Sequence, residues 1–275
     1  MARLLYESHM HTTLCRHSIG EPEEYAQVAW NRNLAGITVT CHNPMPNGYS
    51  ASVRMREDQW DEYVALVARA TAAWAGRIDV RLGLEADFVP GFEKYLEKQI
   101  GSAKLSHVLG SVHPQVGEYI RAHLVANNND AVKYQQTYFE HIAMAAETGL
   151  FDTISHPDIV KNHPKGAWVR ERVWGDILRA LDRIAKTGVA MELNTSGVNK
   201  VIPEMNPGPE MLAEMFRRGI PVVIGADAHE PGRVGDRYGE AMGLLEAAGY
   251  EKIRFFVDRV PRDVGIDAAR ASLAG

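Results

Sequence analysis

The alternation of short apolar runs with longer amphipathic stretches is the feature that most constrains the fold of this 275-residue chain. Such alternation is typical of a parallel sheet built from βα units. The predicted strands are 4–9, 36–41, 79–85, 107–112, 151–155, 189–194 and 221–226. The predicted helices are 22–33, 57–75, 92–101, 130–148, 170–187, 209–218 and 236–248, before an apolar run at 253–257 and a short helical tail. Seven such units predict an α/β fold with a closed or nearly closed barrel.

Composition narrows the classes of protein that the chain can represent. There is no repeat, low-complexity tract or Gly/Ser linker, so we predict a single domain over residues 1–275. The formal net charge of −5 argues against binding of long nucleic acid, although a local basic pocket is compatible with it. No run of 18 apolar residues and no signal-peptide pattern is present, which favours a cytoplasmic protein with no membrane contact.

Polar residues occur at the ends of all seven predicted strands, and five of those ends carry histidine. They are His9 and His11, His42, Glu85, His113, His156, Asn194, and Asp227 with His229. Because the carboxyl ends of parallel barrel strands converge on one face, we expect these side chains to meet there.

The types of residue at these ends indicate metal chemistry. Neutral imidazoles with a few carboxylates are the ligand set of Zn, Mn, Fe and related divalent ions. In an extended segment the side chains of His9 and His11 point the same way, and Asp227 and His229 repeat that spacing. A single His-x-His pair is equally compatible with structural or exposed histidines. The convergence of several such ends favours a metal centre.

The motifs at these positions resemble those of the polymerase-and-histidinol-phosphatase (PHP) superfamily, and most closely its histidinol-phosphatase branch. The resemblance covers nearly the whole chain. The matching motifs are His9-Met10-His11-Thr12, Cys15-Arg16-His17, Glu21-Pro22-Glu23-Glu24-Tyr25, His42-Asn43-Pro44, Gly83-Leu84-Glu85, Gly110-Ser111-Val112-His113, His156-Pro157-Asp158, Glu192-Leu193-Asn194-Thr195-Ser196-Gly197 and Gly225-Ala226-Asp227-Ala228-His229.

The resemblance implies a distorted seven-stranded TIM-like barrel that holds three divalent ions at the carboxyl ends of its strands. The implied ligands are His9, His11, Glu85 and Asp227 for the first ion, Glu85, His113 and His156 for the second, and His17, His42 and His229 for the third. Glu85 would bridge two ions, and a hydroxide between them would attack phosphorus. Asp227 or a histidine such as His229 would donate a proton to the leaving oxygen.

The activity implied by the resemblance is that of a metal-dependent phosphomonoesterase, with L-histidinol phosphate as the preferred substrate. One alternative is a related phosphoesterase that acts on another phosphate ester, such as a nucleotide. A second is a non-catalytic, metal-binding regulatory domain. The oligomeric state is left open by the sequence.

Candidates for substrate contact lie just after the predicted strand ends. Arg16, Lys161, Lys200 and Arg233 could each supply positive charge to a phosphate, and Asn194 is a further polar candidate. The family often places an arginine after the Asn-Thr-Ser-Gly motif that starts at Asn194. Here Lys200 is the nearest cation, and it offers a point charge without the bidentate fork of arginine.

Other positions admit two interpretations. Cys41 stands where the family commonly has an aspartate, and it is either a small buried hydrophobe or a thiolate near the third ion. The segment 43–56 is either a lid or a plain surface loop. We expect Trp168 and Trp174 to pack against the barrel. The histidines outside the ligand pattern are expected to be structural or exposed: His107, His123, His141 and His163.

Overall fold

The computed structural model describes residues 2–274, and its strands form two sheets. The three-stranded sheet has the order β1 (Tyr6–Glu7), β2 (Gly36–Val39), β3 (Asp79–Leu82), and all its pairs are parallel. The larger sheet runs, from one edge to the other, through β4 (Leu84–Asp87), β5 (Val108–Ser111), β6 (Thr153–Ile154), β7 (Ala190–Asn194), β8 (Val222–Gly225), β9 (Lys252–Val257) and β10 (Val260–Gly265). Its pairs are parallel except for the terminal β9–β10 hairpin.

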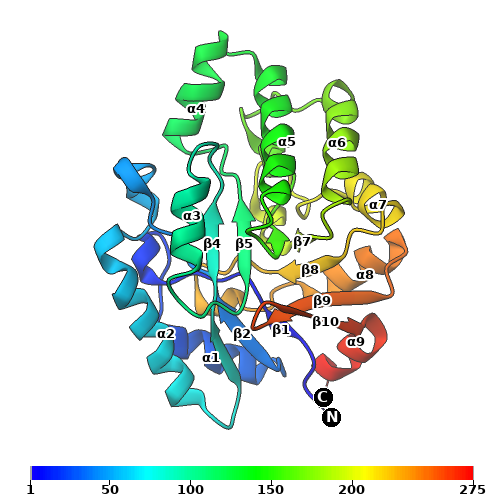
Figure 1. The fold of residues 1–275 in the computed structure, drawn as a ribbon. Coiled ribbons are helices and arrows are strands. Elements are labelled where there is room, and N and C mark those ends of the chain that lie inside the picture. The colour runs from blue at the N-terminus through cyan, green and yellow to red at the C-terminus, as the bar shows by residue number, and fades with distance from the viewer. Residues whose placement is uncertain (1, 275) are drawn as a thin grey trace.

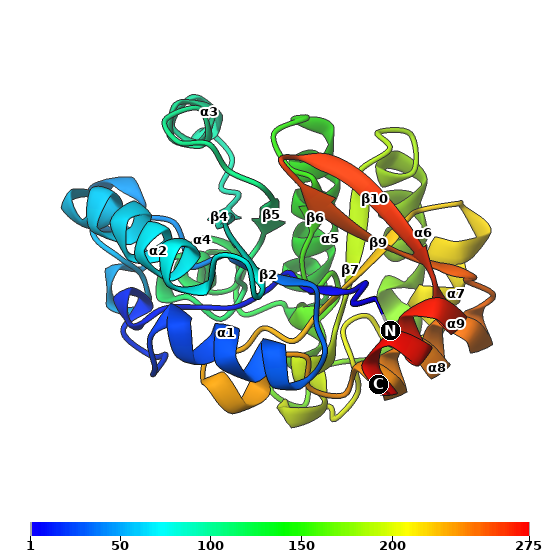
Figure 2. The ribbon, with the colours of Figure 1, turned by 90° about the horizontal axis from the view of Figure 1, so that it is seen from below.

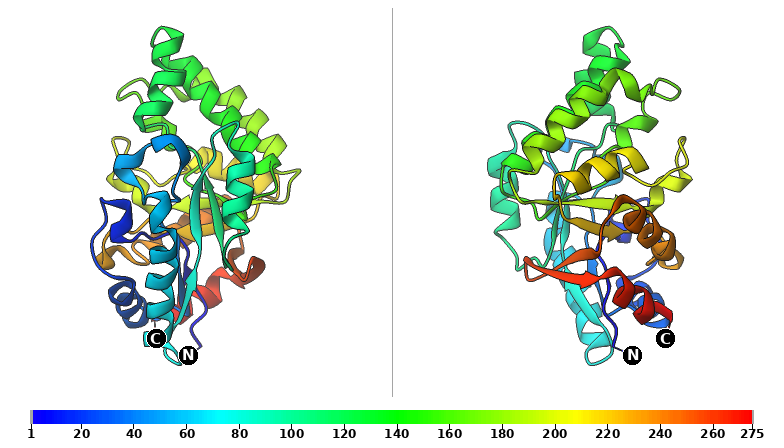
Figure 3. Two further views of the ribbon diagram at one scale, coloured as in Figure 1. Left: turned by 60° about the vertical axis from the view of Figure 1, so that its left-hand side comes forward. Right: turned by 90° about the vertical axis from the view of Figure 1, so that its right-hand side faces the viewer.

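Helices connect most of the successive strands and cover the outside of the sheets (Figure 1). They are α1 (Pro22–Asn31), α2 (Trp60–Trp74), α3 (Glu93–Ile100), α4 (Gly117–His123), α5 (Ala131–Glu147), α6 (Arg170–Ile184), α7 (Pro209–Arg217), α8 (Tyr238–Ala248) and α9 (Ile266–Ala274). Helices α1 and α2 pack on the three-stranded sheet, whereas α5 packs on β5 and β6. Figure 3 shows α4, α5 and α6 at one end of the molecule and α1, α2 and α9 toward the other.

The α/β class with mostly parallel strands is confirmed, but the predicted strand 79–85 is two strands. The chain leaves one sheet at Leu82 and enters the other at Leu84, with Gly83 between them. A Cβ on Gly83 would lie 2.6 Å from the Thr38 side chain and 2.7 Å from the His107 carbonyl oxygen. Only glycine fits where the two sheets approach so closely. The strands therefore form two sheets, and full closure of the closed or nearly closed barrel expected from the sequence is not seen within residues 2–274.

Two isolated bridges bring the sheets together at the carboxyl ends of their strands. Met10 forms a parallel bridge with Ala228, and His42 forms one with Glu85. In the first, Ala228 N–H donates to the His9 carbonyl at 3.0 Å and its own carbonyl accepts from His11 N–H at 2.9 Å. The segments that follow β1, β2 and β8 are thereby fixed beside β4, as the convergence argument requires.

The structure also contains elements that the sequence did not predict. The apolar run 253–257, which is not among the predicted strands, lies in strand β9, and β10 pairs with it antiparallel, as seen from below in Figure 2. Strand β10 is mostly exposed, so its sequence lacks an apolar pattern. Helix α4 is only seven residues long and was missed for a similar reason. No helix within residues 2–274 is long and apolar enough to cross a membrane.

Candidate metal centre

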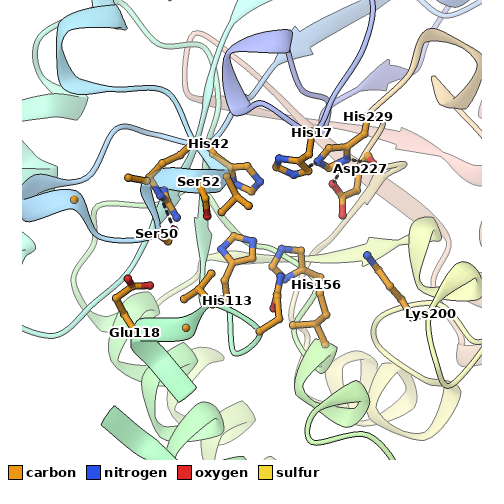
Figure 4. Close-up of a pocket in the computed structure, with 18 residues that line it drawn as sticks. His17, His42, Ser50, Ser52, His113, Glu118, His156, Lys200, Asp227 and His229 are labelled. Carbon is orange, nitrogen blue, oxygen red and sulfur yellow. Dashed lines mark hydrogen bonds and ion pairs between the residues drawn. The ribbon is translucent and has the colours of Figure 1, made fainter. Parts of the chain in front are cut away.

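All nine predicted metal ligands lie together at the carboxyl ends of the strands. Figure 4 shows the imidazoles of His17, His42, His113, His156 and His229 directed toward one another, with Asp227 beside them. The donor atoms of three triads lie within 4.8 Å of one another inside each triad: His9, His11 and Asp227; His17, His42 and His229; and His9, Glu85 and His156. The first two reproduce the core of the first and third ligand sets expected from the sequence.

Glu85 occupies the centre of the cluster and is fully buried. Its Oε1 lies 3.0 Å from His156 Nε2 and 3.3 Å from His113 Nε2. Its Oε2 lies 2.7 Å from His42 Nδ1 and 3.6 Å from His11 Nε2. One carboxylate therefore contacts residues from all three expected ligand sets and lies between them.

Several buried donor atoms that face the centre lack hydrogen-bond partners. Three of them are His9 Nε2, His42 Nδ1 and Glu85 Oε2. The last two lie 2.7 Å apart, but their geometry is not that of a hydrogen bond. A buried polar atom without a partner costs about 1–3 kcal/mol, so several in one place indicate that something else satisfies them. Divalent cations fit this donor set, which supports metal binding.

The opposite nitrogens of the rings are held by oxygen acceptors. His9 Nδ1 pairs with Glu192 Oε1 at 2.7 Å, and His113 Nδ1 with Asp87 Oδ1 at 2.9 Å. His17 Nδ1 lies 2.7 Å from the Cys15 carbonyl oxygen. A ring that donates through Nδ1 keeps its Nε2 lone pair free for a metal. Consistent with this, His17 Nε2 and His229 Nε2 approach to 2.9 Å, a distance at which two lone pairs require a cation or a proton between them.

Local backbone geometry supports the same location. His156 and Asp227 have positive φ angles of 26° and 49°, which are uncommon for residues other than glycine and concentrate at functional sites. On β8, a Cβ at Gly225 would collide with the Glu192 carboxylate and with His9 Cβ. Glycine there leaves room for the Glu192 carboxylate that orients His9.

The electrostatics of the cluster divide its histidines into two groups. Burial lowers the pKa of His113, but the carboxylates of Asp87 and Glu85 outweigh it and raise that pKa to about 10. For His11, the carboxylates likewise outweigh burial and raise the pKa to about 9. Burial lowers the pKa of His42 to about 3, even though Glu85 lies beside it. Burial opposes ionisation of Glu85, but the surrounding imidazoles hold its pKa well below the usual range.

A pocket of about 750 Å³ opens onto this cluster. One wall is the segment from Gly48 to Arg54, and another is Gln115 to Glu118, at the end of the loop after β5 and the start of α4. A second hollow of about 340 Å³ adjoins the first and shares His17, Lys200, Asp227 and His229 with it. A ligand in either hollow would lie against the metal ligands.

The structure separates the five candidates for substrate contact. Lys200 lines both hollows, and Arg233 lines the smaller one. Asn194 is fully buried, and its amide nitrogen donates to Glu192 and Asp227, so it holds the carboxylates in place. Arg16 is exposed and lines neither hollow.

Lys161 also lies outside both hollows, contrary to the expectation for this loop. It is fully buried, and its ammonium donates to Asp158, Glu204 and the Met205 carbonyl at 2.9–3.0 Å. All three of its N–H groups are therefore used, which leaves none for a phosphate.

The structure also shows where the cysteine, the tryptophans and the remaining histidines singled out in the sequence lie. Cys41 is fully buried, and its Sγ accepts from the Thr12 hydroxyl at 3.2 Å. Trp168 and Trp174 pack against the hydrophobic core as expected. The four histidines outside the ligand pattern lie outside the pocket: His107 and His141 are buried, and His123 and His163 are half-buried.

Sequence reasoning missed the groups that hold the ligands in place. Asp87 and Glu192 orient His113 and His9, Arg54 pairs with Asp87, and Glu118 lines the outer pocket. A signal was available for Asp87, which follows Glu85 by two residues on β4 and therefore lies on the same face. Arg54 and Glu118 lie outside the strands, where no periodicity marks them.

This fold and site define a class of α/β proteins with a histidine- and carboxylate-rich metal centre at the carboxyl ends of parallel strands. The chain belongs to the PHP domain family, whose model matches residues 7–196. The family resemblance predicted from the motifs is thus confirmed.

Relatives of known name agree with this membership. The chain is 40% identical to a Deinococcus radiodurans protein named "Probable histidinol-phosphatase", over 91% of this chain and 96% of that protein. It is 24% identical to the histidinol-phosphatase of Bacillus subtilis, over 84% and 96% of the two chains. Among solved structures, it is similar in fold to histidinol phosphate phosphatase from Lactococcus lactis, complexed with zinc, L-histidinol and phosphate. That match has a TM-score of 0.77 at 19% identity and covers 94% of this chain and 98% of the other.

Proposed function

We propose that this protein is a metal-dependent phosphomonoesterase that converts L-histidinol phosphate and water to L-histidinol and phosphate. The observation that carries the proposal is the convergence of eight other predicted ligands on the buried Glu85, beside a pocket of about 750 Å³ that several of those ligands line. The names of the 40% and 24% identical relatives support the choice of substrate.

Three divalent ions, Zn, Mn or Fe, are proposed as the cofactors. The triad of His9, His11 and Asp227 would hold one and that of His17, His42 and His229 another, while Glu85, His113 and His156 would hold the third. Divalent ions bound here would make water nucleophilic near neutral pH and offset the charge of a phosphate dianion. Because Glu85 and Asp227 are only two carboxylates among these ligands, a loaded centre would keep a surplus of positive charge for that dianion.

The chain's own residues assist at the edges of the cluster. Lys200 lines both hollows, so its ammonium would pair with an oxygen of a phosphate bound at their junction. Asp227 and His229 line the same junction, where a leaving alkoxide would need a proton. The imidazoles around Asp227 hold its pKa well below the usual range, and burial lowers the pKa of His229 to about 3, so neither group carries a proton to deliver near neutral pH. We therefore assign Lys200 to phosphate binding, Asp227 and His229 to the adjoining metal site, and Arg233 to the outer part of the smaller hollow.

The organic half of the substrate would extend into the larger hollow. In Figure 4, Lys200 lies to one side of the histidines and Glu118 to the other. Histidinol phosphate carries a cationic amine, and Glu118 is a carboxylate on the pocket wall. We therefore assign Glu118 to the amine end of the substrate, which orients the phosphate toward Lys200.

A panel of phosphate esters tests the proposal. The protein, loaded with Mn²⁺ or Zn²⁺, is given histidinol phosphate, a nucleoside monophosphate and 4-nitrophenyl phosphate, and phosphate release is measured. We expect kcat/KM for histidinol phosphate to exceed the others by at least about a hundredfold. Faster release from the nucleotide would favour the alternative phosphoesterase. No release from any ester, in protein that binds metal, would favour a non-catalytic metal-binding domain.

A further inference from the structure

We infer that Arg54 is a positioning residue for the metal centre. Arg54 acts through Asp87, which orients the ligand His113. This inference rests on the proposed metal centre, although it concerns a residue that no family motif includes. Arg54 lies at the end of segment 43–56, which the sequence left as either a lid or a surface loop. In the structure, the part of that segment from Gly48 to Arg54 lines the pocket.

A continuous chain of contacts runs from Arg54 to the bridging carboxylate. Arg54 Nη2 donates to Asp87 Oδ2 at 2.6 Å. Asp87 Oδ1 faces His113 Nδ1 at 2.9 Å, and His113 Nε2 lies 3.3 Å from Glu85 Oε1. The guanidinium thus fixes the carboxylate whose other oxygen sets the orientation of the imidazole. A metal ligand held in this way keeps its Nε2 aimed at the ion.

The burial of this pair argues against an incidental surface contact. The side chains of Arg54 and Asp87 are 1% and 2% exposed, respectively. A buried ion pair gains little net stability over apolar residues of the same volume, because both charges lose their hydration. Its presence at the wall of the pocket is better explained by the orientation of His113 than by stability alone.

The same guanidinium also anchors its own segment. Arg54 Nε donates to Ser50 Oγ at 2.8 Å, and Nη1 donates to the Asn43 carbonyl oxygen at 2.8 Å. Asn43 follows the ligand His42, and its side-chain oxygen accepts from the Asp87 N–H at 3.0 Å. Both ends of the segment are therefore bound to β4, so that Arg54 couples the pocket wall to the cluster.

The decisive experiment measures metal affinity and coordination in Arg54→Met, Arg54→Lys and the wild type. Affinity is read by competition with a zinc chelator, and coordination by the visible spectrum of the Co²⁺-loaded protein. We expect Arg54→Met to bind its weakest-held ion about tenfold less tightly and to show an altered Co²⁺ spectrum. Arg54→Lys, which can still pair with Asp87, should restore most of the affinity. Arg56→Met removes an exposed arginine of the same segment that pairs with Asp58, and it should change neither quantity.

The outcomes distinguish this inference from the proposed function. If the wild type binds no Zn²⁺ or Co²⁺, the metal centre itself is wrong. If the wild type binds both and Arg54→Met matches it in affinity and spectrum, only the positioning role is wrong. Should Arg54→Met not fold, Asp87→Asn carries the test, because it removes the other half of the pair. Unchanged affinity and spectrum in a folded Asp87→Asn would overturn the inference.

Discussion

The floor and the outer wall of the pocket are formed by different kinds of structural element. The floor consists of residues at strand ends, such as His113 after β5 and His156 after β6, which contact the buried Glu85 of β4, and hydrogen-bonded sheets fix their positions. The wall consists of residues from the segments between strands, such as Arg54 after β2 and Glu118 in the first turn of α4. The comparison teaches that the sheet determines where ions are expected to bind, whereas the loops determine which organic group fits beside them.

The strongest test of the floor is removal of its central charge. Glu85→Gln keeps the shape of the side chain but replaces a bridging carboxylate by an amide that cannot bridge two cations. We expect kcat/KM for every ester to fall by at least about 10³-fold, with a loss of bound metal. Activity assays and elemental analysis measure both. Glu246→Gln, which removes an exposed carboxylate paired with Arg270, is the control and should leave both unchanged. Normal metal content and turnover in Glu85→Gln would show that Glu85 is needed neither for metal binding nor for catalysis.

The difference between floor and wall also explains how much could be predicted from the sequence. Strand periodicity placed His9 and His11 on one side, and parallel strands placed them near Asp227, so the inner donors followed from local patterns. The break at Gly83 did not, since it depends on the approach of Thr38 and His107 from other strands.

Long-range packing hid the supporting residues as well. Lys161 follows a strand end and has the right charge for a phosphate, but the carboxylates of Asp158 and Glu204 hold it inside the protein. Their positions depend on how two distant loops pack, which no local pattern records. Arg54 shows the opposite case, a residue that the sequence did not suggest but that lies in the site. Its segment has no periodicity, yet it folds back onto β4.

The pH dependence of metal binding gives a second test of the floor. The raised pKa values of His113 and His11, about 10 and 9, mean that both rings carry a proton near pH 8 in the metal-free protein. His42 and His229, with pKa values lowered to about 3, carry none. Burial lowers the pKa of His9, but the carboxylates of Glu192, Asp227 and Glu85 outweigh it and hold that pKa well above its usual value, so this ring carries a proton as well. Metal must therefore displace about three protons, and metal affinity should fall about tenfold for each displaced proton with every unit by which the pH is lowered.

Proton release on zinc addition, followed with an indicator dye at pH 8, measures this number directly. His113→Ala should release about one proton fewer, and His163→Ala, at a half-buried position outside the cluster, should match the wild type. The folding stability of the metal-free protein changes with pH in the direction opposite to metal affinity. A raised pKa makes the His113 contribution to stability complete below pH 6.5, and that contribution is lost as the pH rises toward 10. Zinc binding without proton release would contradict these charge states.

The smallest expected effect is a change of KM on substitution of a residue of the wall. It distinguishes the wall from the floor, because it should affect only one substrate. Glu118→Gln removes a partly exposed carboxylate, so the loss of one charge contact with the substrate amine should raise KM for histidinol phosphate about fivefold. The KM for 4-nitrophenyl phosphate, which has no amine, should not change, and kcat should not change for either ester. Glu118 also pairs with Arg121 three residues away, so the matched control is Glu240→Gln, which breaks the equivalent pair with Arg237 far from the pocket. If both esters lost turnover equally in Glu118→Gln, this residue would belong functionally with the floor, because the defect would lie in a step common to all substrates rather than in recognition of the amine.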